Sequence, residues 1–381
     1  MPVLAEDLQP EDFTVRSLPA PGPHWFWAND ISFTRMNDGR AYLFDGDTGQ
    51  MLGQISAGFG HALLQTSPSG HEIYVPETYY SRGSRGERTD VLSIYDGVNL
   101  APVGEVILPN KRYGGLSLEA QMPLSDDGKF ALLYFFTPAQ SVGVVDLTTR
   151  KFVGEIETPG CALVFPFAPR RFAMLCADNA LLVAELDDAG AGKVVGRTEP
   201  LFTEADPVVD KAVRRGGLWY FFSMDGKVHE VEMAPKPKSR KAGAPLPRVV
   251  NQWSLTTAEE AKAGWRSGGF QPYAVHEAGN RLYVLMLQGT RDNRKDPAGE
   301  VWVYDLAKRQ KVQTIKLTEP TITLAVSQDA RAQVFTGPGV STNAHVYDAA
   351  TGAHVHAIPD VGPYITLIQP VTVRAPEQAK P

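Results

Sequence analysis

The sequence repeats one short phrase near its two ends, and this repeat limits what the chain can fold into. Residues 345–358 read His-Val-Tyr-Asp-Ala-Ala-Thr-Gly-Ala-His-Val-His-Ala-Ile, and residues 41–55 follow the same plan. Each phrase is a strand-like run that ends on an aspartate, followed by a Thr-Gly turn and a second run. The pattern predicts an antiparallel β-hairpin that recurs along the chain.

Weaker copies of the hairpin lie between the two ends. Their closing acidic residues, together with those of the two end copies, are Asp45, Asp96, Asp146, Asp187, Glu232, Asp305 and Asp348. A unit of roughly 40 to 50 residues is the length of a four-stranded propeller blade. We therefore predict an all-β fold, a seven-bladed β-propeller of four-stranded antiparallel blades of the YVTN or WD40-like type. An eighth blade inside the widest gap, between Glu232 and Asp305, is the alternative.

One blade cannot bury both of its faces, so the repeating units must stack around an axis as a single domain. We place this domain at residues 16–371, after a short N-terminal arm at 1–15 and before a C-terminal tail at 372–381. A stretch rich in Pro and Lys, residues 235–247, accounts for much of the widest gap. Its composition is typical of a solvated loop, and docking onto an acidic partner is the alternative.

Composition excludes several classes of function. The 381 residues include 37 basic and 43 acidic side chains, and the net charge of -6 argues against a nucleic-acid partner. No apolar run approaches the roughly 20 residues that span a bilayer. The first twelve residues carry Glu6, Asp7, Glu11 and Asp12 where a signal peptide has a basic and then an apolar region. No export signal is therefore visible.

The chain has two cysteines, Cys161 and Cys176, on either side of a predicted strand, turn and strand. They could face each other across neighbouring strands. A disulfide there would close a loop of about 15 residues and stabilise the fold by roughly 3 kcal/mol. Two small buried thiols are the alternative, and the spacing alone leaves both open.

Three separated stretches resemble one known family. They are residues 81–90, residues 137–146 and residues 264–270. Together they closely resemble the large (heavy) subunit of the tryptophan tryptophylquinone-dependent amine dehydrogenases, the methylamine and aromatic amine dehydrogenase family. The likeness extends from Arg16 to Gln369.

The resemblance implies a seven-bladed propeller in the periplasm, with Cys161 and Cys176 joined as a disulfide. It also implies a small (light) subunit that carries tryptophan tryptophylquinone, a cofactor made from two of that subunit's own tryptophans, in a two-plus-two heterotetramer. Such an enzyme oxidises a primary amine to an aldehyde and ammonia. Electrons then pass to a blue copper protein similar to amicyanin or azurin. Large subunits of the family carry an export signal, which this sequence does not show.

By the family pattern, the reactive groups belong to the small subunit. Amine oxidation through a quinone needs an electrophilic carbonyl and a base that removes the α-proton. We therefore predict no catalytic residue, metal ligand or cofactor in this chain, which would instead line the substrate channel and exclude water. Phe59 matches the family position at the channel entrance, and a core phenylalanine is the alternative. A weaker inference places His61 near the substrate or the small subunit.

A dense charge cluster precedes one predicted strand and consists of Arg82, Arg85, Arg88 and Asp90. We interpret it as an internal Arg–Asp network that holds a loop, with an anion or partner-carboxylate site as the alternative. His354 and His356 share one strand face, as metal ligands could, but no third ligand is near them in sequence. The default interpretation of this pair is a half-exposed strand.

Two further features are interpreted as structural. Packing or interface roles are predicted for the six tryptophans, which are Trp25, Trp27, Trp219, Trp253, Trp265 and Trp302. Thr256 and Thr257, followed three residues later by Glu259 and Glu260, are capping-box pairs that start a short helix through Lys262.

Three functions compete on this basis. The first is the large subunit of an amine dehydrogenase, and the second is a propeller scaffold or binding protein without a quinone partner. The third is a hydrolase or lactonase with a metal on the central axis, for which convergent ligands from several blades are not evident. The amine itself stays open, because the stretch at Lys111 and Arg112 looks like the aromatic branch whereas residues 16–30 look like the methylamine branch.

Overall fold

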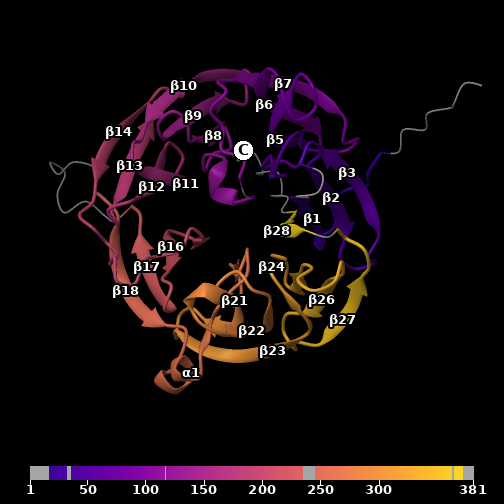
Figure 1. Ribbon diagram of the computed structural model, residues 1–381, viewed down its shortest axis with the longest axis vertical. Coiled ribbons are helices and arrows are strands. Elements are labelled where there is room, and N and C mark those ends of the chain that lie inside the picture. Colours follow the sequence, from indigo (N-terminus) through magenta and orange to yellow (C-terminus); the bar gives the residue numbers. More distant parts are fainter. Residues whose placement is uncertain (1–16, 32–35, 116, 235–244, 363, 372–381) are drawn as a thin grey trace, which may run out of the picture.

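The computed structural model describes residues 17–31, 36–115, 117–234, 245–362 and 364–371. These residues form seven antiparallel sheets arranged as blades around a central axis (Figure 1). The fold is therefore the predicted seven-bladed β-propeller, and the alternative of eight blades is wrong. The predicted N-terminal arm, the C-terminal tail and most of the Pro- and Lys-rich stretch lie outside the described residues.

The first three blades differ in how they are completed. The first contains β28 (Ile365–Pro370), β1 (Trp25–Asp30), β2 (Arg40–Asp45) and β3 (Met51–Ser56). The second contains β4 (Gln65–Thr66), β5 (Glu72–Tyr80), β6 (Arg88–Asp96) and β7 (Pro102–Leu108). The third contains β8 (Phe130–Phe135), β9 (Ser141–Asp146) and β10 (Lys151–Glu157). Single bridges from Arg112 and Leu124 to β8 stand in for its innermost strand.

The remaining blades follow around the ring. The fourth contains β11 (Cys161–Ala168), β12 (Arg171–Cys176), β13 (Leu181–Leu186) and β14 (Gly192–Arg197). The fifth contains β15 (Val213–Arg215), β16 (Leu218–Phe222), β17 (Lys227–Glu232) and β18 (Arg248–Ser254). The sixth contains β19 (Trp265–Ser267), β20 (Tyr273–His276), β21 (Arg281–Gln288), β22 (Ala298–Asp305) and β23 (Gln310–Thr321). The seventh contains β24 (Leu324–Val326), β25 (Gln333–Thr336), β26 (Ala344–Asp348) and β27 (His354–Ile358).

The repeated acidic residues mark the same place in every blade, the end of the third strand in blade order. In six of the seven blades the carboxylate accepts hydrogen bonds from backbone N–H groups of the turn into the outermost strand, whereas Glu232 accepts from the Arg248 side chain. Asp348 accepts from Ala350 at 3.0 Å and Thr351 at 2.7 Å, and Asp146 accepts from Thr148 at 2.8 Å. Side chains of this type satisfy turn donors that would otherwise lack partners. This local chemistry explains why the motif recurs.

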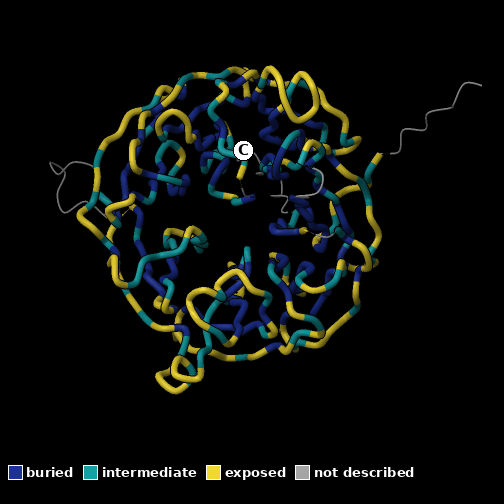
Figure 2. Tube along the Cα trace, viewed as in Figure 1, coloured by how far each residue is buried: buried dark blue, intermediate teal, exposed yellow. Residues whose placement is uncertain are grey.

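Apolar side chains are buried between neighbouring blades, while the outermost strands are exposed (Figure 2). Every residue of β1 is buried, whereas β18 alternates between exposed and half-buried positions. Phe222 and Tyr273 stack across the contact between the fifth and sixth blades, with ring centroids 3.6 Å apart. Burial of each such side chain stabilises the fold by roughly 1.5 to 3 kcal/mol.

The last described strand closes the ring, because β28 pairs with β1 and completes the first blade. Asn29 donates to the Gln369 side chain at 3.0 Å. Gln271, from the sixth blade, exchanges two hydrogen bonds with the backbone of Ile368, at 2.9 and 2.7 Å. Closure therefore joins residues from the two ends of the chain and from a third blade.

The tryptophans and the short helix have the predicted structural roles. Trp265 and Trp302 pack with ring centroids 5.0 Å apart, and the Lys311 ammonium lies 3.5 Å from the Trp302 ring centroid. Helix α1 (Ala258–Lys262) begins at Thr257, which forms a capping box with Glu260. Two 3-10 helices, η2 (Glu119–Gln121) and η3 (Arg291–Asn293), complete the elements described here. None of the described helices is long and apolar enough to cross a membrane.

The loops that connect the strands lie at the two ends of the propeller. The turns that follow the repeated acidic residues lie at one end. The other end, which we call the loop face, holds the connections between successive blades and the loops between the second and third strands. Residues 57–64, 81–87, 109–124 and 136–140 belong to the loop face. Phe59 and most of the predicted charge cluster are therefore brought to the same end.

Candidate functional site

Phe59 lies on the loop face, in the connection from β3 to β4. Its ring is half-buried and meets the Tyr80 ring edge to face, with centroids 5.0 Å apart. Its backbone N–H donates to the carbonyl oxygen of Thr78 at 2.7 Å. Phe59 is thus partly exposed, and contacts with its neighbours hold it in place.

The backbone on both sides of Phe59 requires glycine. Gly58 has φ of +64° and Gly60 has φ of +101°, a region that favours glycine. A Cβ at Gly58 would also come within 2.8 Å of the Thr78 carbonyl oxygen. The Gly60 N–H donates to the carbonyl oxygen of Met36 at 2.6 Å, which ties the same turn to the first blade. The Gly-Phe-Gly sequence therefore sets the direction of the phenylalanine side chain.

A buried polar network lies next to the Phe59 segment. Arg88 donates two hydrogen bonds to Asp90, at 2.9 and 2.7 Å, and Thr78 donates to Asp90 at 2.8 Å. Asp90 also accepts from the backbone N–H of Arg112 at 3.1 Å, and the Arg112 guanidinium donates to the Thr78 hydroxyl at 3.0 Å. Asp90 is fully buried. A buried charge that loses its partner costs several kcal/mol, so these groups hold one another in place.

Three ionisable groups near this network have perturbed pKa values. Burial lowers the pKa of the Arg112 guanidinium to about 10. Burial and then the charge of Arg112 lower the pKa of His61 to about 4, so this imidazole is neutral at pH 7. Burial raises the pKa of Glu77, whose carboxyl accepts hydrogen bonds from the hydroxyls of Ser93 and Tyr95. The His61 side chain is buried in this chain. Its predicted place near the substrate or the small subunit stays a prediction.

The predicted Arg–Asp network is formed by only part of the charge cluster. Arg88 and Asp90 are paired, whereas Arg82 and Arg85 are exposed on the loop face. The network instead recruits Arg112, which is 22 residues from Asp90. Sequence reasoning missed Arg112 because no short-range pattern distinguishes a buried arginine from a surface one.

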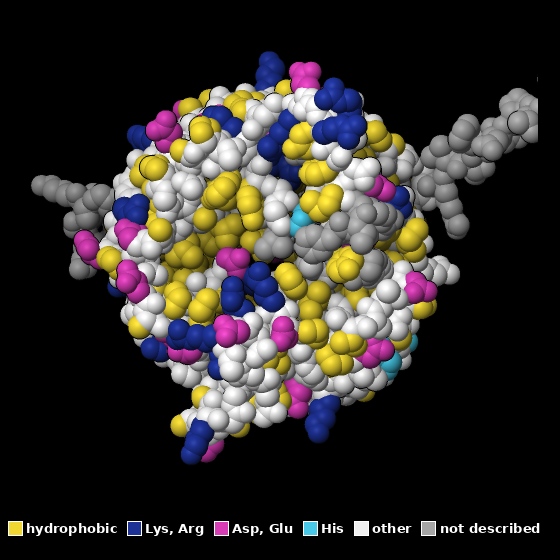
Figure 3. All heavy atoms as spheres, in the orientation of Figure 1, with side chains coloured by type: hydrophobic (Ala, Val, Ile, Leu, Met, Phe, Trp, Pro, Cys, Tyr) yellow, Lys and Arg dark blue, Asp and Glu magenta, His cyan; other side chains and the backbone are white. Residues whose placement is uncertain are grey.

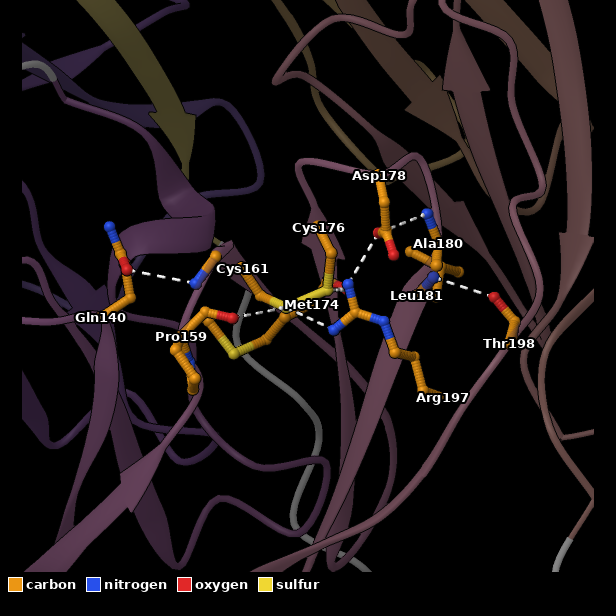
Figure 4. The surroundings of a disulfide bond; sticks show 11 residues. Gln140, Pro159, Cys161, Met174, Cys176, Asp178, Ala180, Leu181, Arg197 and Thr198 are labelled. Atoms are coloured by element: carbon orange, nitrogen blue, oxygen red, sulfur yellow. Dashed lines mark hydrogen bonds and ion pairs between the residues drawn. A yellow bond between two sulfur atoms is a disulfide. The ribbon is translucent and has the colours of Figure 1, made fainter.

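The predicted disulfide joins Cys161 at the start of β11 to Cys176 at the end of β12 (Figure 4). The two residues are paired directly across the antiparallel strands. Arg197 points toward the bond, with its Nη1 3.5 Å from the Cys161 sulfur, and pairs with Asp178 at 2.7 Å (Figure 4). The alternative of two free thiols is therefore wrong.

The histidines of β27 do not gather a metal site in the part of the chain that the structure describes. His354 is exposed and contacts the His345 ring at 3.1 Å, and His345 lies 3.5 Å from Glu319. Among the described residues, no group of three or more His, Cys, Asp or Glu side chains has the arrangement of a metal site.

A cavity of 590 Å³ runs along the propeller axis. Its wall includes Trp27, Trp219, Glu119 and an ion pair in which Arg214 donates to Asp126 at 2.6 and 3.0 Å. Figure 3 shows apolar side chains gathered around the central hollow on one face of the molecule. Burial raises the pKa of the Glu119 carboxyl, which accepts a hydrogen bond from Gln369 at 3.4 Å.

The solved structures with a similar fold belong to proteins with different names and different stated functions. A functionally unknown protein from Desulfotomaculum acetoxidans has a TM-score of 0.58 at 13% identity, covering 87% of this chain and 95% of that one. The periplasmic gluconolactonase of Pseudomonas aeruginosa has a TM-score of 0.57 at 17% identity, covering 92% and 99%. At such low identity the likeness shows the propeller fold alone.

The sequence comparisons are more specific. A family model described as methylamine dehydrogenase heavy chain matches residues 27–371. The methylamine dehydrogenase heavy chain of Paracoccus versutus is 30% identical over 325 residues, covering 84% of this chain and 73% of that protein. That of Methylorubrum extorquens is 28% identical over 324 residues, covering 84% and 76%. Because the match spans nearly the whole propeller, the protein belongs to the methylamine dehydrogenase heavy chain family.

Proposed function

We propose that this chain is the large subunit of a periplasmic quinoprotein amine dehydrogenase, whose small subunit carries tryptophan tryptophylquinone. The observation that carries the proposal is the family match across residues 27–371. It favours a dehydrogenase subunit over a propeller scaffold without a quinone partner. We further propose a two-plus-two heterotetramer that delivers electrons to a blue copper protein.

Exposed apolar side chains support the loop face as the surface that meets the small subunit. Tyr79 is 43% exposed, Phe136 is 47% exposed and Val340 is 66% exposed, and all three lie at this end of the propeller. Apolar surface of this kind marks sites where another protein binds. Tyr113 packs on Phe136 with centroids 5.6 Å apart, so part of this surface is preformed.

In this arrangement Phe59 lines the substrate channel. Its half-buried ring and the ring of Tyr80 offer an apolar surface of the kind that packs against a planar quinone or an amine's carbon chain, so the chain fits such a partner. When bound, the quinone supplies the carbonyl that accepts electrons from the amine. Phe59 restricts the space beside it and excludes water, which favours amines of matching shape. The clamped backbone of Gly58 and Gly60 keeps that wall in position.

The proposal is tested by co-expressing the chain with a candidate small subunit and purifying the complex. We expect a visible quinone absorbance and amine-dependent reduction of a blue copper protein. Steady-state comparison of methylamine with phenylethylamine then identifies the class of amine. Purification of a stable chain without any quinone-bearing partner would contradict the proposal, as would deamination of amines by this chain alone.

A further inference from the structure

A second cavity, of 230 Å³, lies on the loop face between the fifth and sixth blades. Segments 208–211 and 223–224 line it, together with Arg291, Arg294, Lys295 and residues in or near β19 and β20. Its lining contains one acidic side chain, Asp210, and the five basic side chains Lys211, Arg266, Arg291, Arg294 and Lys295. We call this cavity the basic cleft.

Two of the five positive charges are already neutralised. Arg291 pairs with Asp225, with Nε 2.8 Å from the carboxylate, and lies 3.8 Å from Asp206. Lys211 pairs with its neighbour Asp210.

The other three basic side chains have no carboxylate within ion-pair distance among the described residues. Arg266 donates from Nε to the carbonyl oxygen of Gly289 at 2.9 Å, and Lys295 lies 5.7 Å from the centroid of the Phe270 ring. Arg294 and Lys295 are exposed. The Arg266 Nη1 atom is buried without a hydrogen-bond partner in the described part of the chain.

Three basic side chains without ion-pair partners are unfavourable in one cavity unless a bound group compensates their charge. Like charges repel when they converge on one cavity, and a buried guanidinium nitrogen without a partner loses its hydration. An oxyanion would relieve both costs, because arginine presents its donors in a planar fork that matches carboxylate and phosphate oxygens.

We propose that the basic cleft binds an oxyanion group, a carboxylate or a phosphate, held by Arg266, Arg294 and Lys295. In Figure 3, Lys and Arg side chains gather beside the central hollow, in the part of the ring that contains β16 and β21 in Figure 1. The group belongs either to a free anion or to an acidic side chain of the small subunit. Binding of a free anion does not depend on the proposed dehydrogenase function, whereas a carboxylate of the small subunit as the source rests on it.

Titration of the full-length chain with inorganic phosphate at low ionic strength, followed by isothermal calorimetry, tests the proposal. We expect saturable binding that is about tenfold weaker in Arg294→Gln, since one charge-assisted pair of hydrogen bonds is lost. Lys295→Gln should weaken it in the same direction. Both side chains are exposed, so neither change threatens folding. Arg85→Gln is the matched control, because Arg85 is an exposed arginine of the loop face outside the basic cleft.

The same titration on the assembled complex separates the two sources of the anion. If a carboxylate of the small subunit occupies the basic cleft, phosphate should not bind the complex and should weaken assembly more than chloride of equal ionic strength. If the ligand is a free anion, phosphate should bind chain and complex equally. The proposal would be overturned if phosphate did not bind the free chain, or if Arg85→Gln weakened phosphate binding as much as Arg294→Gln. Neither result would bear on whether a quinone-bearing subunit binds.

Discussion

At the scale of single residues, Phe59 and His61 show how one short segment carries two different constraints. Gly58 and Gly60 fix the backbone, and the ring of Phe59 contacts Tyr80. Two residues later His61 is buried close to Arg112. The segment therefore combines a half-exposed apolar side chain with a buried imidazole.

Replacement of Phe59 by alanine should alter the choice among amines more than the chemical step. Loss of one aromatic wall changes transition-state packing by roughly 1 to 3 kcal/mol, or about 10- to 200-fold in the ratio of kcat/KM values. The measurement is kcat/KM for methylamine and phenylethylamine with the co-expressed complex. Val355→Ala, an exposed apolar residue on the outermost strand β27 and away from the loop face, is the control. An unchanged ratio in Phe59→Ala would leave Phe59 as a structural residue.

Burial of His61 predicts a pH dependence of stability. Burial and Arg112 lower its pKa from 6.5 to about 4 in the folded chain. Between these values the unfolded state binds more protons, so the free energy of unfolding should fall as the pH drops from 6.5 toward 4, by up to about 3 kcal/mol. Urea unfolding of His61→Gln across this range should show a flatter dependence than the unchanged protein. An identical slope in both proteins would show that His61 does not titrate as described.

At the scale of elements, the hairpin is the unit that sequence patterns describe best. All seven acidic residues fall at the end of a third strand or directly after it. Six of them cap a turn that is formed within a few residues, and Glu232 is the exception. The innermost strands carry no such signal. β4 has two residues and β15 has three, and the third blade uses single bridges in place of a strand. Their pairing depends on the neighbouring strand and on closure around the axis.

The disulfide is the covalent constraint at this scale. Cys161→Ser combined with Cys176→Ser should lower the free energy of unfolding by roughly 3 kcal/mol, because the bond closes a loop of about 15 residues in the unfolded chain. Urea unfolding with and without a reducing agent measures the effect. Reduction should shift the midpoint of the unchanged protein toward that of the double variant and leave the variant unaffected. Equal midpoints for both oxidised proteins would contradict the prediction.

At the scale of the whole molecule, stability depends on closing the ring. β28 supplies the innermost strand of the first blade. Its residue Ile368 is buried in the core between the first and seventh blades, and Leu367 is buried in the core between the second and third blades. Without it, β1 would expose an unpaired edge and an apolar face.

A chain that ends at Tyr364 should therefore fail to fold cooperatively, whereas a chain that ends at Val371 keeps β28 and should unfold in one transition. Size-exclusion chromatography and thermal unfolding followed by circular dichroism distinguish the two. Cooperative unfolding of the shorter chain at the same temperature as the longer one would show that β28 is dispensable.

The candidate site was partly predictable. The family likeness pointed to Phe59, and the spacing of Arg88 and Asp90 on alternate strand positions suggested their pairing. Arg112 and Thr78 were not identified, since they meet across 34 residues of chain. The basic cleft was not anticipated either, because its basic side chains come from strand β19 and from two connections of the fifth and sixth blades.

The sequence by itself determined the propeller architecture and the place of the repeated turns, because hairpins and their capping carboxylates are local interactions that leave a periodic pattern. It favoured seven blades, and the structure excluded an eighth. It also determined that Phe59 lies between two glycines. Only the tertiary structure decided which charges are buried together, where three basic side chains converge without ion-pair partners among the described residues, and how β28 completes the first blade. Those features depend on contacts between residues far apart in the chain, and such contacts exist only once the blades pack around the axis.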